Sequence, residues 1–277
     1  MNEIEYLNQI TASIARAVAA DHPMMKIDGE NVFSVISAFL SDTVPAIGDD
    51  LIDQSVDRYV AEVLENARAL DPSFLNQDPY IRKIRFNTIK SGRYLLANSS
   101  YEKGEILQYD FPDFEDGVYI PQLGYFTKKT NFPTIYEGRM PWMSVIPSEI
   151  NTMKKPLAEA QGRMLVLGLG LGYYTYMAAR KKNVTEVNVI EVSEDVTALF
   201  EDNILPQFEP ETAAKVKVIH ADAEAYMKKV HAGDYDGIFA DLWQGASDGH
   251  AWYQKLHPYE EKLPQTKFNY WIEEYIR

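Results

Sequence analysis

Three acidic residues stand at the ends of apolar runs, where a sheet could present them to one ligand. Glu191 and Asp241 each end or nearly end such a run, and Asp222 follows another. A carboxylate in that place can accept hydrogen bonds from hydroxyl or amino groups, or take a proton from a nucleophile. Because the carboxyl ends of parallel strands meet at one edge of a sheet, these acids are candidates for a single site.

A glycine-rich turn precedes the three acids. Gly168, Gly170 and Gly172 alternate with leucines, directly after another apolar run. Glycines permit a tight turn and let a ligand approach the backbone without a β-carbon in the way. The dinucleotide pattern G-x-G-x-x-G is not matched, because Tyr173 or Thr175 takes the place of the last glycine, and no G-K-[ST] follows as in a phosphate-binding loop. The turn therefore has the form G-x-G-x-G.

Strand-like and helix-like runs alternate around this turn. The continuous apolar runs are typical of buried parallel strands, and the runs with apolar residues at three- and four-residue steps are typical of helices. The alternation predicts a doubly wound parallel sheet. We expect strands over 163–167, 187–192, 215–220 and 235–241, and helices over 147–160, 173–182, 195–205 and 224–230.

Two segments of different character precede this sheet. Residues 1–80 have a helical periodicity, whereas 81–145 holds short β-like runs separated by turn residues. We therefore expect an N-terminal helical segment over 1–80, a small antiparallel β-rich region over 81–145 and a Rossmann-like domain over 146–277. The expected helices of the first segment are 2–20, 31–41 and 50–70, and the expected strands of the second are 93–97, 105–109 and 117–126.

The G-x-G-x-G loop and the acids that follow it resemble the motifs of the class I methyltransferases that depend on S-adenosylmethionine (SAM). The resemblance implies that Glu191 contacts the ribose hydroxyls and that Asp222 contacts the adenine amino group. Asp241 is the expected catalytic residue, orienting or deprotonating an amine nucleophile. The full set of cofactor-binding residues that we expect is Gly168, Leu169, Gly170, Gly172, Glu191, Val192, Asp222, Ala223 and Asp241.

Residues 147–245 are most similar to the spermidine synthase branch of that superfamily. This branch has a small β-domain in front of the cofactor domain and a helix leading into the glycine strand, here around Glu149. Its D-x-x-D stretch, which orients the polyamine, is only half kept, because Gln244 takes the place of the acid that would follow Asp241. Asp248 could substitute only if the loop folds back, and the acid that the family carries between the glycines is absent. We expect Glu149, Trp243 and Gln244 to face the substrate.

The C-terminal part departs further from the family. We expect 241–257 to be an aromatic loop that could act as a lid, and 268–277 to be a helix in place of a fifth strand. The sheet would then lack its last strands and leave an edge that the N-terminal helices or a second subunit, as in a homodimer, would cover. Asp248, His250 and His257 do not complete a ligand set, so no metal site is expected.

The composition of the chain indicates which classes of binding partner are expected. The formal net charge of −14 disfavours nucleic acid and suits a small or cationic acceptor. The chain has no cysteine, no apolar run of the ~18 residues that a membrane span needs, and an acidic start where a secretory signal would be basic. We expect a cytoplasmic protein without a membrane partner.

Three functions are compatible with these features. The first is a SAM-dependent methyltransferase that acts on a small or cationic molecule. The second is an aminopropyltransferase that uses decarboxylated SAM, against which the missing second acid counts. The third, motivated by the short C-terminal part, is a SAM-binding protein without catalysis. No motif identifies the acceptor or a role for residues 1–80.

Overall fold

The computed structural model describes residues 67–115 and 118–277. The chain forms two compact units, Met1–Phe74 with Ser100–Asn131 and Leu75–Ser99 with Phe132–Arg277. The helices expected over 2–20 and 31–41, and most of the one over 50–70, lie outside the described residues. The prediction of a helix over 50–70 is wrong at its end, because Arg68–Leu70 form a strand, β1. The expected boundaries of the three parts stay predictions.

The first unit contains a three-stranded sheet. Its strands are β1, β4 (Ile106–Glu115) and β5 (Val118–Phe126), in the order β1-β5-β4. β4 and β5 pair antiparallel, and β1 joins the edge of β5 in parallel. The antiparallel character that we expected for this region is present, and β4 extends beyond the predicted run 105–109.

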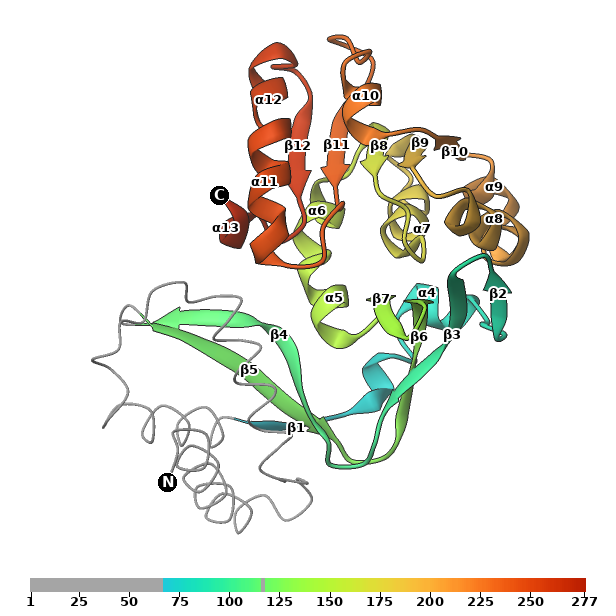
Figure 1. Ribbon diagram of the computed structural model, residues 1–277, viewed down its shortest axis with the longest axis vertical. Coiled ribbons are helices and arrows are strands. Elements are labelled where there is room, and N and C mark those ends of the chain that lie inside the picture. The colour runs from blue at the N-terminus through green and yellow to red at the C-terminus, as the bar shows by residue number, and fades with distance from the viewer. Residues whose placement is uncertain (1–66, 116–117) are drawn as a thin grey trace. The chain divides into compact units, whose positions relative to one another are not determined.

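The second unit is built on a five-stranded sheet in which every neighbouring pair is parallel. The strand order is β10-β9-β8-β11-β12, in which the chain starts at the centre, builds one side and then returns to build the other (Figure 1). This order defines a Rossmann-like fold, with a switch point between β8 and β11 where such sheets bind ligands. The strands are β8 (Gly162–Leu167), β9 (Val184–Glu191), β10 (Val216–His220), β11 (Gly237–Ala240) and β12 (Lys267–Tyr270).

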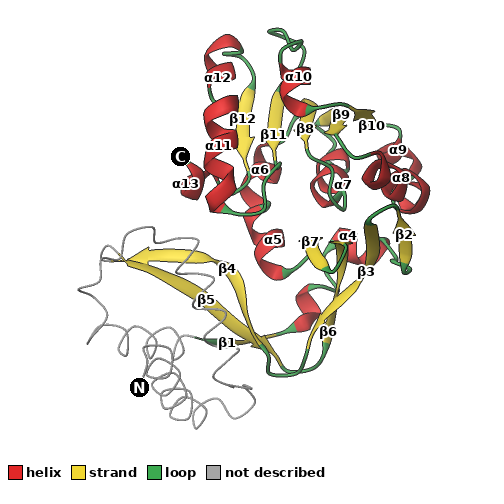
Figure 2. Ribbon diagram, viewed as in Figure 1, coloured by secondary structure: helices red, strands yellow, loops and turns green. Residues whose placement is uncertain are grey.

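The central strands are buried because both of their faces are apolar. Leu165, Val166, Val189 and Phe239 are each at most 1% exposed. Helices α7, α8 and α10 pack against β9, and the strands lie between red helices in Figure 2. The helices of this part are α5 (Pro147–Thr152), α6 (Lys154–Glu159), α7 (Tyr173–Ala179), α8 (Glu194–Asn203), η3 (Leu205–Gln207), α9 (Pro210–Ala213) and α10 (Ala223–Met227).

A second sheet, of order β2-β3-β6-β7, precedes the parallel one in the chain. Sequence analysis predicted β3 but neither of its neighbours in this sheet. The strands are β2 (Ile89–Ser91), β3 (Tyr94–Tyr101), β6 (Thr130–Glu137) and β7 (Met140–Ser144), preceded by a 3-10 turn, η2 (Pro72–Phe74), and a short helix, α4 (Pro79–Lys83). The helix expected over 147–160 is instead two helices, α5 and α6, with Met153 as the cap residue between them.

The C-terminal part differs most from expectation. The predicted loop 241–257 is largely a helix, α11 (Ala246–Leu256), which α12 (Pro258–Lys262) follows. The predicted helix 268–277 is wrong: β12 is a strand that pairs with β11, and only α13 (Glu273–Ile276) is helical. The sheet therefore has the fifth strand that we expected it to lack. Pairing with β11 outweighs the local helical pattern, because it satisfies the backbone of both strands.

No helix in the described part of the chain is long and apolar enough to cross a membrane.

Candidate functional site

The glycine loop leaves β8 at the switch point and enters α7 at Gly172. A β-carbon at Gly168 would stand 2.0 Å from the backbone oxygen of Asp241, and one at Gly170 would stand 2.1 Å from the sulfur of Met143. Both glycines also have positive φ, 96° and 50°. At Gly168 another residue would meet both the backbone of Asp241 and a strained backbone of its own. At Gly170 the positive φ is the main obstacle, because the end of the Met143 side chain can turn aside.

The two leucines of the loop point into the protein. Leu169 is 5% exposed and Leu171 is fully buried. Their side chains anchor the loop to the core, so the loop can offer a ligand mainly its backbone.

Glu191 ties the end of β9 to the glycine loop. Its Oε2 accepts a hydrogen bond from the N–H of Leu169 over 3.1 Å, and its Oε1 accepts one from the N–H of Ser193 over 2.8 Å. Each carboxylate oxygen can accept a second hydrogen bond. The carboxylate is therefore held in one orientation by two backbone groups and keeps the capacity to accept hydroxyl donors.

The next predicted cofactor positions follow β9 and β10. Val192 exposes 66% of its surface. Asp222 is the N-cap of α10, where its Oδ1 accepts the N–H of Ala225 over 2.8 Å, and Ala223 is buried.

Two carboxyls, Glu149 and Asp241, come together from α5 and from the end of β11. Burial, and next the charge of Asp241, raise the pKa of Glu149 from 4.5 to about 8. Burial raises the pKa of Asp241 from 3.8 to about 7. Both side chains keep intermediate solvent exposure, although protein surrounds the carboxyls. Perturbed carboxyls at a switch point are typical of a functional site.

The structure adds anchors that sequence analysis missed. The hydroxyl of Tyr80, on α4, donates a hydrogen bond to the carbonyl of Leu171. On its other side, the N–H of Leu171 lies 3.3 Å from the sulfur of Met143. Asp78 caps α4 and accepts the hydroxyl of Tyr173 over 2.8 Å. The signal in the sequence was Asp78 followed by proline, a favoured start of a helix.

The residues after Asp241 are arranged differently from the polyamine pattern. Asp248 accepts the N–H groups of Gln244 and Gly245, each over 3.0 Å, so both of its oxygens hold the start of α11. Trp243 is 6% exposed and packs on Gly249, whereas Gln244 is exposed. Asp248 therefore serves as a helix cap and does not stand in for the missing second acid.

The histidines of this segment are engaged elsewhere. Nδ1 of His250 lies 2.9 Å from the carbonyl oxygen of Ile276, and Nδ1 of His257 lies 3.1 Å from Oε1 of Glu260. Within the described ranges, no three histidine or acidic side chains gather as a metal site would require.

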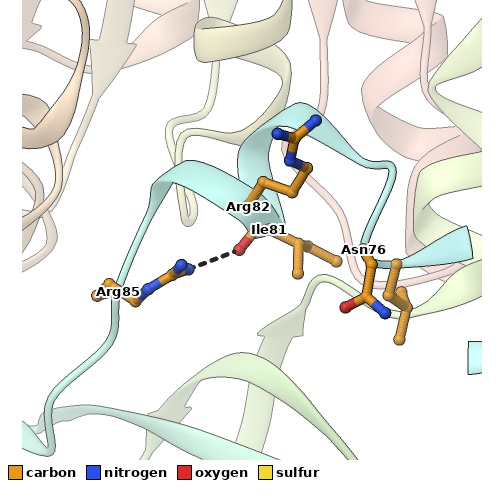
Figure 3. A pocket seen from close by; sticks show the side chains of 5 residues that line it. Asn76, Ile81, Arg82 and Arg85 are labelled. Carbon is orange, nitrogen blue, oxygen red and sulfur yellow. Dashed lines mark hydrogen bonds between the residues drawn. The ribbon is translucent and has the colours of Figure 1, made fainter. Parts of the chain in front are cut away.

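A separate cavity lies on α4. It has a volume of about 310 Å³ and contains none of the predicted site residues (Figure 3). Arg82 and Arg85 line it, and a guanidinium nitrogen of Arg85 donates to the carbonyl of Ile81 over 3.1 Å. Two arginines thus line this cavity, and Glu149 and Asp241 are not among its lining residues.

Known proteins that are similar to this chain are found among solved structures. No protein-family model matches the sequence, and neither does any curated protein. A precorrin 8w decarboxylase from Methanobacterium thermoautotrophicum is 19% identical, with a TM-score of 0.32 over 44% of this chain and 61% of that one. A probable spermidine synthase from Corynebacterium glutamicum is 12% identical, with a TM-score of 0.37 over 58% of this chain and 53% of that one.

The methyltransferase domain of bacterial CtHen1-C is 15% identical, with a TM-score of 0.31 over 40% of this chain and 56% of that one. The chain thus spans between 53% and 61% of the length of these structures. These structures include a methyltransferase domain and a probable spermidine synthase. The strand order carries the assignment of the fold itself.

Proposed function

We propose that the protein is a SAM-dependent methyltransferase that acts on a small cationic amine. The observation that carries the proposal is the pair of carboxyls with raised pKa values, Glu149 and Asp241, at the switch point of the sheet beside the glycine loop. Burial disfavours the charged form of both acids, and a cation against them would offset that cost. A neutral or anionic acceptor would not offset the cost of ionising the two acids.

The residues of the loop suit the cofactor. The backbone of Gly168–Gly172 permits close approach, Glu191 retains acceptor capacity for ribose hydroxyls, and the exposed Val192 offers an apolar surface for adenine. When bound, SAM supplies an electrophilic methyl group on a sulfonium with a good leaving group. The protein then has to hold the acceptor in line and remove its proton.

Asp241 is the proton acceptor in this proposal. A carboxyl with a pKa of about 7 is poised to take a proton from an ammonium group near neutral pH. Burial and the charge of Asp241 both favour the protonated form of Glu149, which in that form can donate a hydrogen bond beside Asp241.

The alternative is aminopropyl transfer from decarboxylated SAM. The retained first acid, Asp241, supports it, because both reactions need a group to receive the amine proton. The use of Asp248 as the cap of α11 counts against it, because the second acid of the D-x-x-D stretch then has no replacement in this segment. We therefore place methyl transfer first.

Calorimetric titration of the whole chain with SAM, S-adenosylhomocysteine and decarboxylated SAM tests the proposal. We expect SAM and S-adenosylhomocysteine to bind, and Glu191→Ala to weaken both by about 10- to 100-fold through the loss of charge-assisted hydrogen bonds. Glu186→Ala, at the other end of β9, is the matched control. Preference for decarboxylated SAM would favour the alternative, and no binding of any of the three would overturn both.

The acceptor is tested with putrescine as an amine probe and butanediol as its uncharged counterpart. With SAM present, we expect labelled methyl groups to reach putrescine and not butanediol, and Asp241→Asn to slow this transfer by about 10²- to 10⁴-fold. If SAM binds but no methyl group reaches any amine of a small-molecule extract, the protein is a SAM-binding protein without catalysis.

A further inference from the structure

Trp271, the first residue after β12, connects the end of β11 to α5. Its backbone N–H donates to the carbonyl of Ala240 over 2.9 Å. Its indole Nε1–H donates to Oγ1 of Thr152 over 3.0 Å, and the hydroxyl of Thr152 donates to the carbonyl of Glu149 over 2.9 Å. One residue therefore joins the strand that ends beside Asp241 to the helix that carries Glu149.

The indole end of this chain of hydrogen bonds is buried. Trp271 is 7% exposed, and its indole N–H donates to the hydroxyl of Thr152, which is half-buried. Hydrogen bonds in such surroundings are stronger and fix the geometry of the groups that they join. The contacts are thus suited to holding two elements in register.

The backbone immediately after Trp271 is strained. Ile272 has φ 51° and ψ 37°, and it is the one non-glycine residue with positive φ among those that the structure describes. A β-branched side chain rarely adopts this conformation, so the surrounding packing must impose it. That packing is visible in Ile276, which is 1% exposed and whose methyl group contacts Gly249 on α11.

Strain of this kind concentrates at sites that depend on exact placement of a neighbouring group. β12 ends at Tyr270, and the left-handed turn at Ile272 follows Trp271 and leads into α13 at the next residue. The indole is thereby held against α5 and is not carried along a continuing strand or helix.

We propose that Trp271 is a positioning residue that sets the distance between Glu149 and Asp241 through Thr152. The inference rests on the proposed function only for what the acid pair does. Its structural content can be tested without cofactor or acceptor, because the protonation of Glu149 reports how tightly the pair is enclosed. Release of α5 would hydrate Glu149 and move it away from Asp241, and both changes lower its pKa.

The test is a carbon-13 NMR titration of Glu149 in the whole chain. We expect Trp271→Phe and Thr152→Val each to lower the pKa of Glu149 by at least about half a unit, a shift well within the range that environment produces in proteins. Thr152→Ser keeps the hydroxyl and should restore the wild-type value. The double variant should shift the pKa no further than the larger single shift, because both changes break the same chain of contacts.

Trp252→Phe is the control for the loss of an indole N–H, since Trp252 lies on α11 and Nζ of Lys255 lies over its ring. An unchanged Glu149 pKa in both folded single variants would overturn the inference, and so would an equal shift in the control. Thr152→Val alone decides the matter if Trp271→Phe does not fold. If the variants show the shifts but the wild-type protein binds no SAM, the proposed function is refuted and the positioning role of Trp271 stands.

Discussion

The carboxyl of Glu149 lies near enough to Asp241 that the charge of Asp241 adds to burial in raising its pKa to about 8. Asp241 itself is raised to about 7 by burial. At neutral pH the pair therefore retains protons that exposed carboxyls would have lost. An approaching ammonium group would favour ionisation of both, so binding of a cationic acceptor and release of a proton are coupled.

Removing the carboxyl of Asp241 should lower the pKa of Glu149. We expect Asp241→Asn to lower the pKa of Glu149 below about 8, because the like charge is gone. The value should stay above 4.5, since burial is the larger cause and remains. Carbon-13 NMR of the Glu149 carboxyl in the variant measures this directly. A pKa that does not move would show that the two carboxyls are not neighbours.

The same acids make the stability of the fold depend on pH. Their pKa values are higher in the folded than in the unfolded chain, so the folded state binds more protons between about pH 4 and pH 8, the range bounded by these values. Stability from this source is complete below that window and is lost as pH rises through it. Thermal unfolding should show a falling midpoint, by ~2–4 °C for each ~1 kcal/mol lost.

Glu149→Gln should flatten that decline, because a neutral amide has no proton to release. The matched control is Glu201→Gln, an exchange at an exposed acid on α8. An equally steep decline in Glu149→Gln and in the wild type would contradict the assignment of the window to the acid pair.

Much of the parallel sheet could be predicted from the sequence, because its central strands carry their own signal. Strands such as β8 are buried on both faces, so they are continuous apolar runs, and the glycine loop marks the switch point. The places of Glu191, Asp222 and Asp241 could be predicted in the same way, because each follows or ends one of these apolar runs. Local pattern was sufficient wherever burial alone decided the conformation.

The remainder depends on contacts between distant segments. β12 is a four-residue strand whose aromatic residues also fit a helix, and only its pairing with β11 decides between the two. The approach of Glu149 to Asp241 and the support from Trp271 and Tyr80 arise in the same way. No spacing within a single segment encodes them.

The two glycines of the loop should differ in their tolerance of alanine. In Gly168→Ala the new methyl group would meet the backbone oxygen of Asp241, which cannot move without shifting β11. In Gly170→Ala it would meet the flexible end of Met143, which can turn aside. We expect Gly168→Ala to cost about 2 kcal/mol or more in unfolding free energy and Gly170→Ala less. Denaturant unfolding compares them, and equal losses would mean that the left-handed φ values outweigh the clashes.

Tyr80 should matter more to cofactor binding than to stability. Burial keeps the phenol protonated by raising its pKa well above the ordinary value, so it donates to Leu171 at any physiological pH. Tyr80→Phe removes this contact and frees one side of the glycine loop. We expect SAM affinity to fall about 5- to 10-fold, as the loss of a hydrogen bond of ~1 kcal/mol implies.

The control for Tyr80→Phe is Tyr226→Phe, which also removes a phenolic hydroxyl, here one that lies 2.9 Å from the hydroxyl of Tyr235. Calorimetric titration with SAM should separate the two variants. Equal affinities would show that the loop keeps its conformation without support from α4.

Asp248 provides the sharpest distinction between methyl and aminopropyl transfer. Its two oxygens accept the N–H groups of Gln244 and Gly245, so Asp248→Ala should destabilise the start of α11 by about 1 kcal/mol, as the loss of a helix cap does. Asp248→Asn keeps one acceptor oxygen and should lose less. Because this carboxylate is committed to the helix, neither change should alter the pH dependence of transfer to an amine, which Asp241 governs. A pH profile that shifts in Asp248→Asn, with unfolding free energy unchanged, would make Asp248 the second acid of a polyamine site and reverse the order of the two proposed reactions.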